Sequence, residues 1–170
     1  MGIKKINKLL VANRGEIAIR IFRAATELQI RTVAIFTYED RYSLHRYKAD
    51  ESYQIGKNDE PLKPYLNVEE VVLLAKRVGA DAIHPGYGFL SENVKLAELC
   101  RKENIIFIGP KPEVMVKLGD KIEAKKIAEN ANVPIIRGEE IHNDDETTIF
   151  KKAKKIGYPI MLKAASGGGG

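Results

Sequence analysis

Short apolar runs alternate with segments of helical periodicity from Lys8 to Pro110, and this alternation constrains the fold more than any other feature. Thr32–Phe36 is almost continuously apolar, which is typical of a parallel strand covered on both faces. The predicted strands are Lys8–Ala12, Thr32–Phe36, Ser52–Ile55, Asp81–His84 and Ile105–Ile108. Strands that alternate with helices predict an α/β fold built on a Rossmann-like parallel sheet with right-handed crossovers.

The helix boundaries follow from periodicity and capping patterns. Asn67 and Glu70 have the spacing of a capping box, and Gly79 is placed to end the helix that they begin. Asp120 and Glu123 form a second such pattern, at the start of a basic helix. The predicted helices are Glu16–Leu28, Asn67–Val78, Asn93–Lys102, Asp120–Asn130 and Thr148–Ile156.

The pattern of predicted strands and helices changes after Pro110. Strands predicted at Val133–Ile136 and Tyr158–Lys163, together with two helices, are too few elements to bury a core of their own. We therefore expect one complete domain over residues 1–118 and the start of a second domain over residues 119–170, with a lid from about residue 135. On this interpretation the chain is the N-terminal piece of a larger protein.

Composition excludes several classes of protein. The 170 residues are 44% hydrophobic and 30% charged, as in ordinary soluble proteins, and no apolar run is as long as a membrane span. The first strand begins a few residues after Met1, so neither a signal nor a transit peptide is expected. Cys100 is the only cysteine, which excludes a disulfide framework and a cysteine metal cluster. We expect Cys100 to be a buried structural thiol. We also expect a reducing, cytoplasmic setting and no membrane association.

The net charge of +5 does not by itself indicate nucleic-acid binding. The lysines are scattered or paired with acidic residues, and no basic strip interleaved with aromatic residues occurs. We attribute the excess of positive charge to sites for phosphate ligands.

The C-terminal residues have the pattern of a phosphate-binding loop. A strand predicted at Tyr158–Lys163 is followed by Ser166 and the glycines Gly167, Gly168, Gly169 and Gly170. Glycine backbones can approach a polyphosphate closely, and the Lys163 ammonium would supply a compact positive charge. The four glycines alone would favour a flexible linker, whereas the strand before them favours the phosphate loop.

The segment HPGYGFLSEN, residues 84–93, follows a strand at the carboxyl edge of the predicted sheet, where open α/β folds bind ligands. Its proline and glycines impose a tight turn, and we expect Tyr87 and Glu92 to line a cavity there. The alternative is a plain turn, with Ser91 as a helix N-cap and His84 as a buried, hydrogen-bonded ring. Taken alone, that alternative is favoured for His84 and Ser91.

Three further features have competing interpretations. The turn at Asn13–Gly15 lacks the three glycines of a dinucleotide fingerprint, so a nicotinamide dehydrogenase is not expected, and Arg14 either contacts a ligand or caps the loop. Lys121 in the first turn of a helix suggests a nearby anion, or is a solvated surface lysine. The two members of each pair, Glu16/Arg20 and Arg23/Glu27, are four residues apart on a helix. They lie either on a solvated face or at a subunit interface.

These segments together resemble biotin carboxylase, the ATP-grasp component of biotin-dependent carboxylases. The matching stretches are VANRGEIAIR (11–20), ADE (49–51), DAIHPGYGFLSEN (81–93), FIGP (107–110), GDK (119–121) and LKAASGGGG (162–170). The run HRYKADESYQIG (45–56) resembles the pyruvate carboxylases within this group; the alternative is the subunit of an acetyl-CoA or propionyl-CoA carboxylase. The resemblance implies a pre-ATP-grasp domain over 1–118 and the start of an ATP-grasp domain over 119–170.

The resemblance also implies a function for the parent enzyme, an ATP-dependent carbon–carbon ligase. ATP, with Mg²⁺, would activate bicarbonate, which would carboxylate biotin on a carrier domain, and pyruvate would then receive the carboxyl group to give oxaloacetate. Lys121, Lys163 and Ser166–Gly170 would contact the ATP phosphates, and Tyr87 and Glu92 would face the active-site cavity. Arg23 and Glu27 would lie at the biotin carboxylase dimer interface. No residue of this chain is assigned as catalytic or as a metal ligand, so this chain alone is expected to be inactive.

Two alternative functions, from other classes of protein, remain open. The chain could be a non-catalytic module for dimerisation or effector binding, in which Arg41, Arg46 and Lys48 meet the phosphates of acetyl-CoA; a solvated loop is the simpler interpretation of those residues. Another ATP-grasp ligase, such as a carbamoyl-phosphate synthetase, is the second reading, and the stretches at residues 84–93 and 45–52 argue against it.

Overall fold

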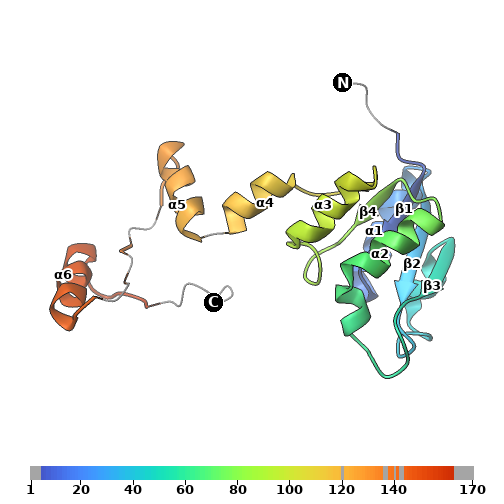
Figure 1. The fold of residues 1–170 in the computed structure, drawn as a ribbon, viewed down its shortest axis with the longest axis horizontal. Coiled ribbons are helices and arrows are strands. Elements are labelled where there is room, and N and C mark those ends of the chain that lie inside the picture. The colour runs from blue at the N-terminus through green and yellow to red at the C-terminus, as the bar shows by residue number, and fades with distance from the viewer. Residues whose placement is uncertain (1–4, 120, 136–137, 140, 142–143, 163–170) are drawn as a thin grey trace. The chain divides into compact units, whose positions relative to one another are not determined.

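The computed structural model describes residues 5–119, 121–135, 138–139, 141 and 144–162. The chain divides into two compact units, Met1–Val116 and Lys117–Gly170, which are treated separately below. Figure 1 shows the sheet of the first unit with its helices, and the helices of the second. Among the described residues, no helix is long and apolar enough to cross a membrane.

A five-stranded parallel sheet forms the centre of the first unit. Its order is β3-β2-β1-β4-β5, and β1 pairs with β2 through Leu10 opposite Val33 and with β4 through Leu10 opposite Ile83. The strands are β1 (Lys8–Val11), β2 (Arg31–Phe36), β3 (Glu51–Gln54), β4 (Ala82–His84) and β5 (Ile106–Phe107). The predicted α/β fold with a parallel sheet is therefore confirmed.

Helices connect the strands, as the sequence predicts (Figure 1). They are α1 (Gly15–Glu27), α2 (Val68–Arg77) and α3 (Val94–Lys102), with 3₁₀ helices η1 (Leu44–Lys48) and η2 (Lys63–Leu66) in the loops around β3. A further helix, α4 (Pro112–Gly119), was not predicted. Its apolar residues Val114, Met115 and Val116 are consecutive, so the sequence does not single out one face of a helix there.

The side chains of β1 alternate between two buried cores. Leu9 and Val11 pack in a cluster with Phe22 of α1, whereas Leu10 belongs to a cluster that contains Val71 of α2 and residues of α3. Such alternation is the period of a strand, and both faces are buried because helices cover both. The free thiol of Cys100 lies fully buried in the second cluster, where burial raises its pKa to about 12. The prediction of a structural thiol agrees with this position.

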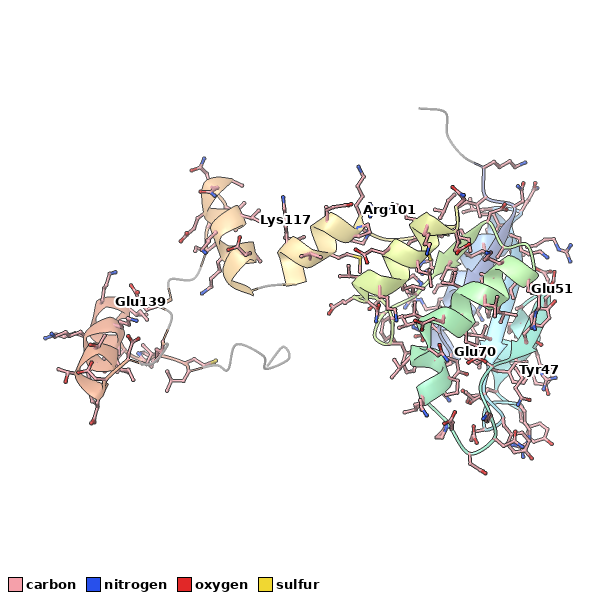
Figure 2. The ribbon with its side chains drawn as sticks, in the orientation of Figure 1. Tyr47, Glu51, Glu70, Arg101, Lys117 and Glu139 are labelled. Atoms are coloured by element: carbon pink, nitrogen blue, oxygen red, sulfur yellow. The ribbon has the colours of Figure 1, made fainter. Side chains whose placement is uncertain are left out.

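Two predicted caps differ in detail. Asn67 caps α2 by accepting a hydrogen bond from the Glu70 N–H at 3.1 Å, but the Glu70 carboxylate accepts from the Gly56 N–H at 2.7 Å instead of completing the capping box (Glu70 is labelled in Figure 2). Ser91 is not the N-cap of α3, because Asn93 holds that position and accepts from the Leu96 N–H at 3.0 Å. The interpretation of Ser91 as a cap was therefore wrong by two residues.

The described part of the second unit contains α5 (Lys121–Asn130) and α6 (Glu146–Ile156), both predicted. Asp145 caps α6 by accepting from the Thr148 N–H at 3.1 Å, and Ala153 is its buried residue. The strands predicted at 133–136 and 158–163 are wrong as far as residues 133–135 and 158–162 are concerned, since none of these is in a strand. An extended segment becomes a strand only beside a hydrogen-bonded partner, and these residues pair with no strand of the described chain.

Candidate active site

The carboxyl ends of β1 and β4 meet at the centre of the sheet. β1 pairs with β2 on one side and with β4 on the other. The chain therefore adds strands in one direction as far as β3, and in the opposite direction from β4 onward. Open α/β sheets bind ligands outside the strand ends at this point. The Ala12 N–H donates to the His84 carbonyl at 2.8 Å, which extends the pairing to the last residue before the two loops that follow.

Asn13, immediately after β1, joins these two loops. This residue is 3% exposed. The Nδ2 amide donates to the carbonyl oxygens of Pro85 at 2.7 Å and Tyr87 at 2.9 Å, and Oδ1 accepts from the Arg14 N–H at 2.8 Å. One carboxamide therefore fixes both the turn after β4 and the chain that enters α1.

The turn after β4 depends on glycine. Gly86 has φ of +69°, and a Cβ there would lie 2.7 Å from the Asn13 Nδ2 atom, so both conformation and space exclude a side chain. The Gly86 N–H donates to Nδ1 of His84 at 3.0 Å, and burial lowers the pKa of this half-buried imidazole. His84 is thus a neutral, hydrogen-bonded ring that supports the turn, as the plain-turn interpretation predicts.

A cavity of about 370 Å³ lies between this turn and the start of α1. Tyr87 lines it and is 65% exposed, so its ring and hydroxyl are available to a ligand. Glu92 is exposed on the approach to α3 and is not among the residues that line the cavity. The lining residues are Asn13, Arg14, Gly15, Glu16, Ile17, Tyr87, Gly88 and Phe89.

Arg14 is held by a buried carboxylate in the loop after β2. Its guanidinium donates twice to Asp40, from Nε and Nη2, each at 2.5 Å, and Asp40 also accepts from the hydroxyls of Tyr65 at 2.7 Å and Ser43 at 2.8 Å. Burial opposes the charge of Asp40, but these hydrogen bonds outweigh it and hold the pKa of the carboxyl well below its usual range. The hydrogen bond to Asp40 raises the pKa of Arg14. The pair is therefore charged at all ordinary pH values.

Tyr65 connects the Arg14–Asp40 pair to the turn. Its side chain is fully buried, and its ring stacks on Phe89 with 5.4 Å between the ring centroids. Burial, and then the hydrogen bond to Asp40, raise the pKa of the Tyr65 phenol, which remains a donor. The Arg14–Asp40 pair, the Tyr65–Asp40 hydrogen bond and the Tyr65–Phe89 stack thus tie together the loops after β1, β2, β3 and β4.

A second cavity, of about 600 Å³, lies beside α1 and η1. His45 lines it, and its Nε2 lies 3.1 Å from the Ile35 carbonyl. Burial lowers the pKa of the His45 imidazole, whose Nδ1 has no hydrogen-bond partner among the described residues. Arg20 and Arg23 line the same cavity, together with Gly15, Glu16, Ile19, Ser43 and Leu44.

The basic residues before β3 are partly engaged within the protein. The guanidinium of Arg41 lies 3.9 Å from the ring centroid of Tyr38, and that of Arg46 lies 4.4 Å from the centroid of Phe36. Arg46 also donates to the Arg41 carbonyl at 2.6 Å. Lys48 is exposed. These arginines therefore shape their own loop as well as giving it positive charge.

The remaining predicted residues fall in three places. Arg23 and Glu27 are exposed on α1, and within the described chain they form no ion pair, whereas Glu16 and Arg20 pair at 3.4 Å. Lys121 is the first residue of α5. Lys163 and Ser166–Gly170 lie outside the described residues. In the described ranges, no group of three or more His, Cys, Asp or Glu residues could hold a metal ion.

Sequence reasoning missed three residues of this site. Asn13 was placed only in a turn, and Asp40 and Tyr65 were not considered. Asp40 lies in the polar loop after the second strand, and in the structure its carboxylate accepts two hydrogen bonds from Arg14. No local pattern in the sequence marks it as the partner of that arginine.

A doubly wound parallel sheet with its cavity at the strand reversal defines the class of fold. The sequence model of the biotin carboxylase N-terminal domain matches residues 5–115, and that of the ATP-binding domain of the carbamoyl-phosphate synthase L chain matches residues 120–170. The chain belongs to the biotin carboxylase N-terminal domain family.

Relatives from bacteria and from humans extend this result. The chain is 52% identical over 170 residues to pyruvate carboxylase of Bacillus subtilis, which covers 100% of this chain and 15% of that protein. Human mitochondrial pyruvate carboxylase is 49% identical over 98% of this chain and 14% of its own length. Biotin carboxylase 2 of B. subtilis is 49% identical over 96% of this chain and 36% of its own length.

Solved structures agree with the sequence relatives. A pyruvate carboxylase variant of Rhizobium etli with the allosteric activator acetyl coenzyme-A superposes with a TM-score of 0.86 at 50% identity, over 98% of this chain and 15% of that one. The biotin carboxylase domain dimer of Hydrogenobacter thermophilus 2-oxoglutarate carboxylase, in complex with MgADP, ADP and bicarbonate, gives a TM-score of 0.88 at 48% identity, over 98% of this chain and 36% of that one.

Proposed function

We propose that this chain forms the N-terminal part of the biotin carboxylase component of a pyruvate carboxylase. The parent enzyme would use ATP, Mg²⁺ and bicarbonate to carboxylate biotin on a carrier domain, and would transfer the carboxyl group to pyruvate to give oxaloacetate. The observation that carries the proposal is the 52% identity to a pyruvate carboxylase over 100% of this chain. The cavity beside Tyr87, at the strand reversal, gives the first unit a place for a ligand.

The nucleotide side of the reaction is assigned to the second unit. Lys121, Lys163 and Ser166–Gly170 would contact the ATP phosphates, in an ATP-grasp domain that begins near residue 119. The match of an ATP-binding domain to residues 120–170 supports this assignment, as does the MgADP bound by the H. thermophilus relative. Phosphoryl transfer depends on positioning and neutralising charge, which lysines and backbone N–H groups provide.

The first unit would provide the biotin side and the contacts between subunits. Tyr87 and Glu92 would face the active-site cavity, and the exposure of Tyr87 on the cavity wall supports its part of this role. Arg23 and Glu27 would belong to the biotin carboxylase dimer interface; both are exposed, and the H. thermophilus relative is a dimer. The loop of Arg41, Arg46 and Lys48 would meet acetyl-CoA, the activator bound by the R. etli enzyme.

The activity is tested on the full-length protein that carries this chain. We expect ADP release that requires both bicarbonate and biotin, and oxaloacetate formation when pyruvate is added. ADP release that is independent of biotin would contradict the proposed function. Carboxylation of 2-oxoglutarate in place of pyruvate would keep the biotin carboxylase assignment and contradict the acceptor.

Lys163→Gln tests the nucleotide assignment in the same protein. Losing a charge-assisted contact to phosphate is expected to lower kcat/KM for ATP about ten- to a hundredfold. The reverse half-reaction, decarboxylation of oxaloacetate, should keep its rate because it needs no ATP. The matched control is Lys154→Gln, at an exposed lysine of α6, which should leave both rates unchanged. If Lys163→Gln lowered both rates together with the melting temperature, Lys163 would be a structural residue.

A further inference from the structure

We propose that Asn13 is a positioning residue for biotin carboxylation: it holds the Pro85–Gly88 turn against the start of α1, and so sets the distance between the two walls of the Tyr87 cavity. This inference rests on the proposed function and extends it to a residue that does not itself react. Its basis is the set of contacts made by one buried carboxamide.

The hydrogen bonds of Asn13 use all the donor capacity of its side chain. An amide nitrogen carries two hydrogens, and the two carbonyl oxygens of Pro85 and Tyr87 take one each. Both partners are acceptors, so the nitrogen, and not Oδ1, must face the turn. Oδ1 faces the Arg14 N–H. At 3% exposure there is little water to replace any of these partners.

Two other contacts of the turn are the hydrogen bond from the Gly86 N–H to His84 and the stacking of Phe89 on Tyr65, and neither joins it directly to the start of α1. Pro85 has no N–H to donate, and Gly86, Gly88 and Phe89 all have positive φ, at +69°, +65° and +42°. The Tyr87 side chain forms no hydrogen bond within the described chain and is 65% exposed, so its position follows from the backbone beneath it. A Cβ at Gly86 would lie 2.7 Å from the Asn13 Nδ2 atom, so only glycine lets the turn lie this close to the carboxamide.

Asn13 acts on both walls of the cavity at once. The turn supplies Tyr87 and Gly88, and the chain that follows Asn13 supplies Arg14 and Gly15. The two walls belong to segments more than 70 residues apart, as the separation of 72 residues between Asn13 and Pro85 shows. A shift of about 1 Å between groups that hold a reactant can cost about a hundredfold in rate, so a residue that fixes this spacing affects catalysis without touching the reactant.

Asn13→Asp in the full-length protein is the sharpest test, because the two side chains have the same shape. A carboxylate only accepts hydrogen bonds, and it would face two carbonyl oxygens. We expect kcat/KM for free biotin to fall about ten- to a hundredfold, with KM for ATP unchanged. The matched control is Asn93→Asp, since Asn93 uses only its oxygen, as the acceptor for the Leu96 N–H, and aspartate preserves that bond.

Asn13→Ala accompanies this variant, because it removes the same donors without adding a charge. A fall in kcat/KM for biotin in either folded variant, with KM for ATP retained, supports the proposal. Unchanged biotin kinetics in both folded variants overturn it, and so does loss of the fold in both, which would make Asn13 purely structural. A wild-type protein without biotin-dependent ADP release would overturn the proposed function itself, whereas an active wild type with an unaffected Asn13→Asp variant overturns only this inference.

Discussion

The two units of the chain are stabilised in different ways. The first unit buries both faces of its sheet, with residues such as Leu10, Ile35 and Leu96 at 0% exposure. In the described part of the second unit, Ala153 is the only buried hydrophobic residue, while larger apolar side chains such as Phe150 and Leu118 are 58% and 56% exposed. Burial of apolar surface is the main favourable contribution to folding, so stability is concentrated in the first unit. The helices of the second rely on caps and ion pairs, which contribute much less.

The largest difference in stability between the two units should come from truncating an apolar side chain in each. Leu10→Ala, at a residue of β1 with 0% exposure, should lower the free energy of unfolding by about 2–5 kcal/mol. Phe150→Ala, at the 58% exposed residue of α6, should change it by less than about 0.5 kcal/mol. Urea unfolding of the whole chain, followed by far-ultraviolet circular dichroism, measures both. Equal losses in the two variants would mean that Phe150 has a buried partner.

The Arg14–Asp40 pair should have the next largest effect. Asp40→Asn keeps the shape of the side chain but removes the charge that binds the guanidinium, and we expect a loss of about 1–3 kcal/mol at neutral pH. Asp145→Asn is the control in the second unit, because asparagine caps a helix as well as aspartate does, and it should have no measurable effect. Urea unfolding at pH 7 distinguishes them. An unchanged midpoint for Asp40→Asn would show that the Arg14–Asp40 pair makes no net contribution to stability.

The same pair predicts a dependence on pH. The pKa of Asp40 is lower in the folded protein than its usual value of about 3.9, so the unfolded chain binds more protons between these two values. The contribution of Asp40 is therefore complete above about pH 5 and is lost as the pH falls toward the folded pKa. The stability difference between wild type and Asp40→Asn should shrink from pH 5 to pH 3. A difference that stays constant over this range would contradict the charged pair.

Helix caps provide the smallest comparison. Asn67→Ala removes the acceptor for the Glu70 N–H at the start of α2, and should cost the first unit about 1 kcal/mol in global stability. Asp145→Ala removes the equivalent bond of α6, and we expect reduced helix content without a shift of the main unfolding transition. Circular dichroism during a urea titration separates these outcomes. A shift of the main transition by Asp145→Ala would show that α6 unfolds together with the sheet.

The sequence predicted the sheet well because its signal is local. Strands such as Thr32–Phe36 are apolar on both faces, and the helices between them carry their own periodicity, with asparagine caps at the start of α2 and α3. The short helix α4, with its consecutive apolar residues Val114, Met115 and Val116, was missed. The strand expected from Val133 was wrong because a strand is defined by its partner, which the apolar residues of a segment do not specify.

The site could be predicted only in part. The sequence pointed to Tyr87 through the glycines and proline around it, which restrict the backbone locally. The contacts of Asn13 and Asp40 could not be predicted, since their partners are distant in sequence: 72 residues separate Asn13 from Pro85, and 26 separate Arg14 from Asp40. A polar side chain after a strand carries no local mark of the carbonyl or guanidinium that it will meet when the fold closes.

Residue-resolved amide hydrogen exchange on the whole chain, in dilute solution, tests the contrast between the units most directly. Amides of β1, β2 and β4 should exchange only through global unfolding, with a free energy equal to that from urea. Amides of α5 and α6 should exchange faster by on the order of a hundredfold or more, because opening those helices exposes little buried apolar surface. Equal protection in α6 and β1 would contradict the account, since it would require a buried core around α6 that the described residues do not provide.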